Sequence, residues 1–279
     1  MRVNPDYEDA RAGHESAHIP IIPFTDLERR VSQGLAAGEF HLAFQGIYQV
    51  STGGLSRIEA LIRWMHPDYG LLLPEAFLVV LKNPQVALEL TYFVIDSVCC
   101  ELGHAVRDGQ TVCPIAINVP PSVAAYAHFA GDFERIARSY GVSMDLLEIE
   151  LAESEDAAKI LASKSLTKPL RESGISLAID DFGTGYSSLA LLSTFDVDTV
   201  KLARELLGEA PLSERAAKVV AGILSLLDGL GVFVVVEGVE TKAQAQWLAQ
   251  WPNVLVQGYF YSRPMLDLAR VPGHVECVV

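Results

Sequence analysis

Cysteine is scarce in this chain of 279 residues: there are four, and their spacing is not that of a metal site. Cys99 and Cys100 are adjacent, which makes them poor disulfide partners for each other. We therefore expect these two residues, together with Cys113 and Cys277, to be buried free thiols in a reducing compartment.

Long apolar runs are also absent. The stretch 77–100 comes closest, but Lys82, Pro84 and Glu89 interrupt it before it reaches the roughly 18–20 residues of a membrane span. Residues 1–23 contain acidic side chains and lack the apolar core of a secretory signal, so we interpret them as a flexible tail. Together these features predict a cytosolic protein with no membrane span.

Positive charge is in short supply, with 21 Lys and Arg against 35 Asp and Glu and a net charge of −14. Surfaces that bind DNA or RNA neutralise phosphates with Lys and Arg, so the sequence argues against a nucleic acid polymer as partner. No G-x-x-x-x-G-K-[ST] motif for a nucleoside triphosphate is present. A small phosphorylated ligand held by metal ions remains open.

What the chain does contain is an alternation of strand-like and helix-like segments. Half of its residues are hydrophobic, which suits strands that are buried on both faces. The predicted strands are 40–50, 55–64, 114–119, 146–151, 175–180, 199–202, 232–236 and 254–261. The predicted helices are 75–106, 122–140, 155–173, 187–194, 212–230 and 241–251.

This alternation predicts a parallel sheet, and eight strands in a chain of this length match the (β/α)8 TIM-type barrel of the α/β class. The first two strands are joined only by residues 51–54, whereas a parallel connection needs about a dozen residues or more. We therefore expect an antiparallel first strand. No linker is evident, so we assign residues 24–279 to one barrel domain.

Polar residues gather where these strands end, which is where barrel enzymes carry their chemistry. In the fourth strand, Glu148 and Glu150 share one face and should point inward, while the aliphatic residues between them face the helices. From the second strand to the eighth, the residues collected in this way are Glu59, Asn118, Glu150, Glu153, Asp180, Asp181, Lys201, Glu237, Glu240 and Gln257.

Each of these residues has an ordinary explanation when it is taken alone: Glu240 as a helix-start charge, Glu153 as a solvated strand end, Asn118 as a turn former. Together they are harder to dismiss, because like charges near 4 Å repel by about 4 kcal/mol per pair at an effective dielectric constant of 20. Five carboxylates face one lysine, a deficit that two divalent cations would neutralise. The donors are oxygens, which favours Mg²⁺ or Mn²⁺ and predicts metal-dependent phosphoester hydrolysis.

Other motifs explain less. Gly183-Thr184-Gly185 hints at a dinucleotide-binding loop, but Ser188 stands at the third glycine position and tandem aspartates would repel a pyrophosphate. Ser187 and Ser188 have no adjacent histidine and are better interpreted as helix caps. His66, which precedes Pro67, is better interpreted as a turn residue than as a ligand.

The segment 59–64, which reads EALIRW, resembles the signature of the EAL-domain cyclic di-GMP phosphodiesterases. The resemblance extends from about residue 40 to 265 and includes DDFGTGYSSL at 180–189, VEGVET at 236–241, QGY at 257–259 and SRP at 262–264. It implies a TIM barrel with an inverted first strand, two Mg²⁺ or Mn²⁺ ions, and hydrolysis of cyclic di-GMP to linear pGpG.

The resemblance also implies roles for individual residues. The metal-surrounding residues would be Glu59, Asn118, Glu150, Asp180, Asp181 and Glu237. Lys201 would touch the attacking water, Glu237 or the metals themselves would assist its deprotonation, and Gln257 would orient a water or metal ligand. Gln45, Arg63 and Asp181 would bind substrate, with Glu153 and Glu240 supporting nearby loops. A homodimer in which 182–207 lies near the interface is also implied.

The chain departs from the family pattern at Gly46, Pro120, Ala152 and Ala203, none of which is a metal ligand. The last two put rate and regulation in question more than the chemistry. The alternative is a receptor that binds cyclic di-GMP without cleaving it, and a further one is a protein-interaction module that no longer binds the nucleotide. Receptors of this kind usually lack the signature glutamate or a metal ligand, whereas here all are present.

Overall fold

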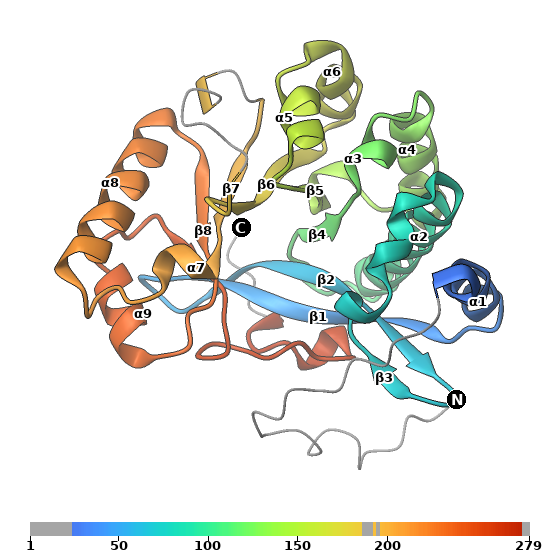
Figure 1. The fold of residues 1–279 in the computed structure, drawn as a ribbon, viewed down its shortest axis with the longest axis horizontal. Coiled ribbons are helices and arrows are strands. Elements are labelled where there is room, and N and C mark those ends of the chain that lie inside the picture. Colours follow the sequence, from blue (N-terminus) through green and yellow to red (C-terminus); the bar gives the residue numbers. More distant parts are fainter. Residues whose placement is uncertain (1–23, 186–191, 194–195, 275–279) are drawn as a thin grey trace.

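The computed structural model describes residues 24–185, 192–193 and 196–274, and at its centre one sheet closes on itself (Figure 1). In this part of the chain the strand order is β1-β9-β8-β7-β6-β5-β4-β2-β3, and β1 also pairs with β2. The eight barrel strands are β1 (Phe40–Gln49), β2 (Leu55–His66), β4 (Ile115–Asn118), β5 (Leu147–Ala152), β6 (Ser176–Phe182), β7 (Thr199–Leu202), β8 (Phe233–Val236) and β9 (Leu255–Val256). The predicted TIM-type barrel is confirmed.

Strand β1 is the inverted one, as the short 51–54 connection predicts. It pairs antiparallel with both β2 and β9, whereas the strands from β2 through β4 to β9 pair in parallel. The β1–β2 register sets Gln45 opposite Glu59, so these two side chains share a face. A short strand, β3 (Gly70–Leu72), pairs with the end of β2 outside the barrel and was not foreseen.

Several predicted helices are interrupted in the structure. Helix α2 (Pro84–Arg107) starts nine residues later than the predicted helix 75–106. Asn83 is its N-cap, and the Asn83 side chain accepts hydrogen bonds from the backbone N–H groups of Gln85 and Val86. The residues before it form two short 3₁₀ helices, η2 (Pro74–Ala76) and η3 (Leu78–Lys82). The segments 122–140 and 155–173 divide into α3 (Pro121–Ala124) and α4 (Phe129–Tyr140), and α5 (Glu155–Leu161) and α6 (Lys164–Ser173).

Two further helices, α8 (Glu214–Leu230) and α9 (Lys242–Leu248), lie close to the predicted 212–230 and 241–251. The short helix α7 (Arg204–Leu207) and the 3₁₀ turns η4 (Met144–Leu146) and η6 (Leu268–Arg270) were not predicted. Helix α9 begins with a capping box between Thr241 and Gln244. Helix α1 (Phe24–Ala36) was not predicted. The proposed tail 1–23 and most of the predicted helix 187–194 fall outside the described residues.

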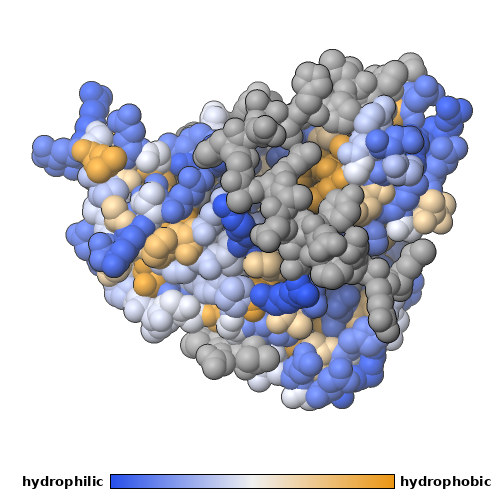
Figure 2. All heavy atoms as spheres, turned by 90° about the horizontal axis from the view of Figure 1, so that it is seen from below, coloured by the Kyte–Doolittle hydropathy of each residue, from blue (hydrophilic) through white to orange (hydrophobic). Residues whose placement is uncertain are grey.

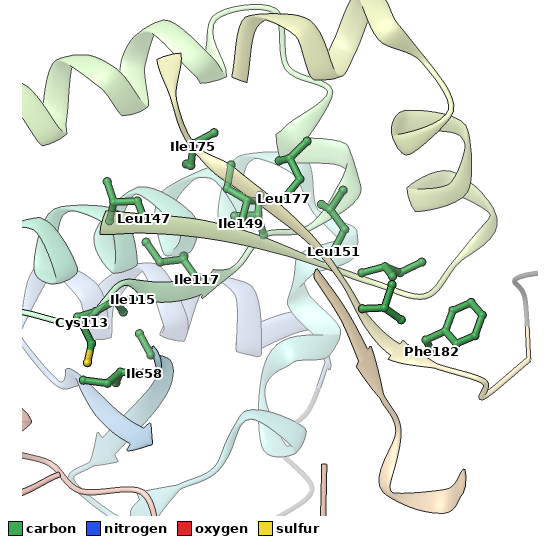
Figure 3. Close-up of a cluster of buried hydrophobic side chains, with 14 of the residues drawn as sticks. Ile58, Cys113, Ile115, Ile117, Leu147, Ile149, Leu151, Ile175, Leu177 and Phe182 are labelled. Atoms are coloured by element: carbon green, nitrogen blue, oxygen red, sulfur yellow. The ribbon is translucent and has the colours of Figure 1, made fainter. Parts of the chain in front are cut away.

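The outer faces of the strands form the main core. Leu147, Ile149 and Leu151 of β5 lie beside the aliphatic residues of β4 and β6, on the side where the helices pack (Figure 3). Burying such a side chain stabilises the fold by about 1.5–3 kcal/mol. Glu148 and Glu150 point the other way, into the barrel, as the alternation along β5 predicts.

Beneath the candidate site, a layer of the barrel interior contains an ion pair between Arg57 and Glu148. An Arg57 Nη1–H donates to Glu148 Oε2 at 2.6 Å, and the hydroxyl of Thr199 donates to the same oxygen at 2.7 Å. Burial raises the pKa of Glu148, against the opposing effects of Arg57 and Thr199. This layer fixes β2, β5 and β7 to one another beneath the candidate site.

The expectation for the cysteines is only partly confirmed. Cys99 is a buried free thiol and Cys100 is a free thiol at a partly exposed position. Cys113, in contrast, is disulfide-bonded, so its assignment as a free thiol was wrong. Spacing along the sequence does not reveal which cysteine a fold brings within bonding distance of another. Cys277 lies outside the described residues.

On the face shown in Figure 2, hydrophobic residues lie in separate groups between hydrophilic ones. Among the described residues, no helix is long and apolar enough to cross a bilayer.

Candidate active site at the carboxyl end of the barrel

The centre of the candidate site is a fully buried lysine surrounded by carboxylates. Lys201, on β7, places its Nζ atom 3.0 Å from an oxygen of Glu150 on β5 and 3.0 Å from Asp180 on β6. The same nitrogen lies 3.3 Å from Glu59 on β2 and 2.9 Å from Glu237, which follows β8. The closed barrel thus brings residues from five strand ends to one point, as their positions in the sequence predict.

The protonation of these groups follows from burial and from the shared lysine. Desolvation alone would lower the pKa of Lys201, but Asp180, Glu150, Glu237 and Glu59 together hold it well above the usual value, so the lysine is charged. Burial raises the pKa of Glu150 well above its usual value and that of Glu237 to about 8. Without metal ions, the site therefore retains protons that free carboxyl groups release.

Glu59 is the exception among these acids. Burial would raise its pKa, but Lys201 and the side-chain amides of Gln257 and Asn118 outweigh that effect and lower it. Asn118 Nδ2 donates to one carboxylate oxygen at 2.8 Å, and Gln257 Nε2 donates to the other at 2.8 Å. Glu59 is consequently held as an oriented anion.

Gln257 connects this centre to the rim. Its Nε2 also lies 3.4 Å from Gln45 Oε1, and Gln45 Nε2 donates to the Ser262 carbonyl at 3.0 Å. The neighbouring Gly46 N–H donates to Ser262 Oγ at 3.2 Å. A Cβ at Gly46 would come too close to the buried Tyr48 hydroxyl, so glycine fits this position, which is one of the four departures from the family pattern.

The tandem aspartates lie on a distorted strand end. In a regular strand, Asp180 and Asp181 would point to opposite faces. Asp181 has φ +55°, and the β6–β7 register shifts between Ile179 and Phe182. As a result, carboxylate oxygens of both aspartates and of Glu237 lie within 4.8 Å of one another. A left-handed, non-glycine residue costs about 1–3 kcal/mol and is typical of functional sites.

Two overlapping groups of acids are close enough to hold cations. One consists of Glu59, Glu150 and Asp180, and the other of Asp180, Asp181 and Glu237. Buried oxygens of Glu150 and Asp180 accept no hydrogen bond, although Asp180 Oδ1 is 3.0 Å from Lys201 Nζ. Unpartnered carboxylate oxygens of this kind fit hard divalent cations, so the donor set agrees with the metal type expected from the sequence.

The two residues predicted to support loops differ in their surroundings. Glu153 Oε2 accepts hydrogen bonds from the backbone N–H groups of Gly183 at 2.7 Å and Thr184 at 3.0 Å, which ties the end of β5 to the turn after β6. Glu240 is exposed near the start of α9, where its own backbone N–H donates to Gln244 Oε1. The structure does not bring Glu240 into the acidic cluster.

A cavity of about 700 Å³ opens beside the cluster. Glu59, Asn118, Asp180 and Asp181 line one end, and the departures Pro120 and Ala152 are also in its wall. The opposite wall comes from η2, η3 and α2 and contains Glu75, which sequence reasoning missed because it fell at the start of a predicted long helix. Ala203 is fully buried at the end of β7, away from this lining.

Arg63, which was predicted to bind substrate, lies on β2 and has 8% of its surface exposed. Its Nη1 donates to the Ile62 carbonyl at 2.9 Å. Burial lowers the pKa of Arg63, against the opposing charges of Glu75, Glu59 and Tyr259.

Comparison with known proteins agrees with this geometry. The chain is 33% identical over 239 residues to the cyclic di-GMP phosphodiesterase NbdA of Pseudomonas aeruginosa, covering 86% of this chain and 30% of that protein. It is 26% identical to the probable cyclic di-GMP phosphodiesterase PdeN of Escherichia coli, covering 85% of this chain and 46% of PdeN. The chain therefore spans less than half the length of these curated relatives.

Among solved structures, the chain resembles the PaMucR phosphodiesterase in complex with cyclic di-GMP, with a TM-score of 0.78, 29% identity and coverage of 86% of this chain and 97% of that one. The FimX EAL domain of Pseudomonas aeruginosa, also bound to cyclic di-GMP, has the same fold at a TM-score of 0.78 and 19% identity. The profile of the EAL domain matches residues 28–264. With that match over most of its length, the chain belongs to the EAL domain family.

Proposed function

We propose that this chain is a phosphodiesterase that hydrolyses cyclic di-GMP to linear pGpG with two divalent cations, Mg²⁺ or Mn²⁺. The observation that carries the proposal is the cluster of four buried or half-buried acids around a single lysine, with the exposed Asp181 beside them. The relatives named as cyclic di-GMP phosphodiesterases support the same substrate.

The residues proposed to hold the ions are Glu59, Asn118, Glu150, Asp180, Asp181 and Glu237. Bound there, two divalent cations would lower the pKa of a water and stabilise charge on the phosphoryl oxygens. The Lys201 ammonium would hold the attacking water by hydrogen bonding. Glu237, whose carboxylate lies 2.9 Å from the Lys201 ammonium, or the metals themselves would assist deprotonation of that water.

Substrate binding is assigned to the rim. We propose that Gln45 and Arg63 bind the guanine and phosphate ends of the dinucleotide and that Asp181 contacts it beside the cluster. Gln257 would keep Glu59 oriented and position a water or metal ligand, as its 2.8 Å hydrogen bond to Glu59 supports. Glu153 would hold the turn that carries Asp181.

A turnover assay tests this proposal. The purified chain is incubated with cyclic di-GMP and MgCl₂ or MnCl₂, and the products are separated by chromatography. We expect pGpG from the unaltered chain, none with EDTA, and a loss of at least about 100-fold in rate for Glu59→Ala. The control is Asp228→Asn, which removes one exposed acid on α8 and should leave the rate unchanged.

Two outcomes would count against the proposal. Binding of intact cyclic di-GMP without cleavage would favour the receptor alternative, and undiminished hydrolysis by Glu59→Ala would remove the assigned metal role. Homodimer formation and a cytosolic location stay predictions. The first is tested by sedimentation of the purified chain, and the second by fractionation of cells that produce it.

A further inference from the structure

Glu75 is a charged group in the cavity that the proposed mechanism does not use. It lies in η2, is exposed, and forms no hydrogen bond or ion pair with another described residue. It is nevertheless the acid that acts most strongly on the Arg63 guanidinium. Glu75 is thus a carboxylate acceptor in the cavity wall with capacity for a ligand.

The wall between Glu75 and the acidic cluster is largely aliphatic. Ile62 contributes from β2, Leu78 and Leu81 from η3, and Val119 and Pro120 from the segment after β4. A flat apolar slot suits the faces of a heterocyclic base, whose stacking needs no hydrogen bonds. The cluster at the other end supplies the place for a phosphate and its metals, so one cavity offers both sites.

We infer that Glu75 selects guanine over other purines in this slot. The inference rests on the proposed function and adds to it a residue that determines base specificity. Guanine is the purine whose Watson–Crick edge carries two neighbouring donors, N1–H and N2–H, which a carboxylate accepts together.

The same carboxylate disfavours the alternatives. Adenine turns its N1 acceptor toward the Glu75 carboxylate, so an acceptor faces an acceptor. Hypoxanthine keeps N1–H and O6 but lacks the N2 amine, so it loses one of the two hydrogen bonds to Glu75. A site that leaves a polar group unpaired rejects a ligand more strongly than one that merely fits it less well.

The test compares three cyclic dinucleotides, carrying guanine, hypoxanthine or adenine, with the unaltered chain and with Glu75→Gln. Gln has the same shape as Glu, but its side-chain amide has one acceptor oxygen in place of two. It therefore accepts only one of the two hydrogen bonds from the guanine edge. We expect KM for cyclic di-GMP to rise about 10- to 100-fold with kcat within threefold, and the preference for guanine over hypoxanthine to fall by a similar factor.

Asp156→Asn is the matched control. Asp156 lines the same cavity from α5 and is paired with Lys159, so the variant removes an equal charge at a different point of the rim. It should leave the base preference of the chain unchanged. An equal change in both variants would show that the cavity responds only to net charge, and this would overturn the inference.

A binding measurement separates this inference from the proposed function. Titration calorimetry with the linear dinucleotides pGpG and pApA does not depend on cleavage of a cyclic ligand. If the unaltered chain cleaves no cyclic dinucleotide but prefers pGpG, and Glu75→Gln loses that preference, the phosphodiesterase proposal fails and the role of Glu75 stands. If the chain cleaves cyclic di-GMP and Glu75→Gln keeps the full guanine preference, the role of Glu75 fails alone.

Discussion

Lys201 is the one cationic side chain that the described residues place within 4 Å of the acids in the barrel mouth. Its ammonium group offsets part of the mutual repulsion of four carboxylates that the barrel forces together. Removing one member of a buried ion pair lowers the free energy of unfolding by far more than the pair's net contribution to it, because the remaining charges stay buried without compensation.

Replacement of Lys201 by methionine should therefore destabilise the metal-free protein. We expect the free energy of unfolding in EDTA to fall by about 3–5 kcal/mol, and the loss to become smaller when MnCl₂ is added, because cations replace the missing positive charge. Urea denaturation in both buffers measures this. Lys218→Met is the control, since Lys218 forms only an exposed helix pair with Glu214, worth under about 0.5 kcal/mol. Equal losses in the two variants would contradict the account.

Individual residues also show what sequence reasoning can reach. Glu59, Asp180 and Lys201 could be placed together, because strand ends of a barrel meet at one mouth. That Asp181 joins Asp180 could not be derived from alternation, since it depends on the left-handed backbone at Asp181. Nor could the contact between Glu153 and the turn at Gly183, which links residues 30 positions apart.

At the scale of elements, the turn after β6 connects the metal-binding acids to the rest of the barrel. Glu153 is its anchor through two charge-assisted hydrogen bonds to backbone N–H groups, which are about twice as strong as neutral ones. Because the same turn sets the conformation of Asp181, the anchor acts on the site without touching the cluster.

Glu153→Ala should weaken metal binding while the fold remains intact. We expect about a 10- to 100-fold loss of Mn²⁺ affinity, typical of removing a group that orients a ligand, with little change in melting temperature. Glu153→Gln keeps an acceptor oxygen and should recover part of the affinity. Titration calorimetry with Mn²⁺ measures both variants. Unchanged affinity in Glu153→Ala would exclude the positioning role.

The elements also show where patterns mislead. Most strands were predicted closely because their buried runs are short and continuous, but the last, predicted at 254–261, is only Leu255–Val256. The helices were joined across breaks that depend on local capping. Asn83 starts α2 by accepting two backbone hydrogen bonds, a signal that the apolar periodicity around it concealed. The correction matters for the site, because η2 and η3 form the wall that carries Glu75.

For the whole molecule, the buried acids couple folding to pH. Glu150 and Glu237 have raised pKa values in the folded state, that of Glu237 being about 8, so the folded chain holds protons that the unfolded chain has already released. Stability therefore falls as pH rises from the ordinary carboxyl range toward that value. The lowered pKa of Glu59 acts in the opposite direction.

This predicts a melting temperature that depends on both pH and metal ions. In EDTA it should fall between about pH 5 and pH 8, since raised carboxyl pKa values favour the protonated, folded chain at the lower pH. With MgCl₂ the decline should be smaller, because cations bind the deprotonated acids and release their protons. Thermal scans across this range, with and without metal, measure the difference. A metal-induced stabilisation that is larger at low pH would contradict this expectation.

The stoichiometry of Mn²⁺ binding tests the central claim most directly. Titration of the metal-free chain at neutral pH should show two Mn²⁺ ions per chain, accompanied by proton release. Asp180→Ala, which alters both acidic groups, should bind fewer. Failure of the unaltered chain to bind Mn²⁺, or full binding by Asp180→Ala, would show that the acids around Lys201 do not form a metal centre.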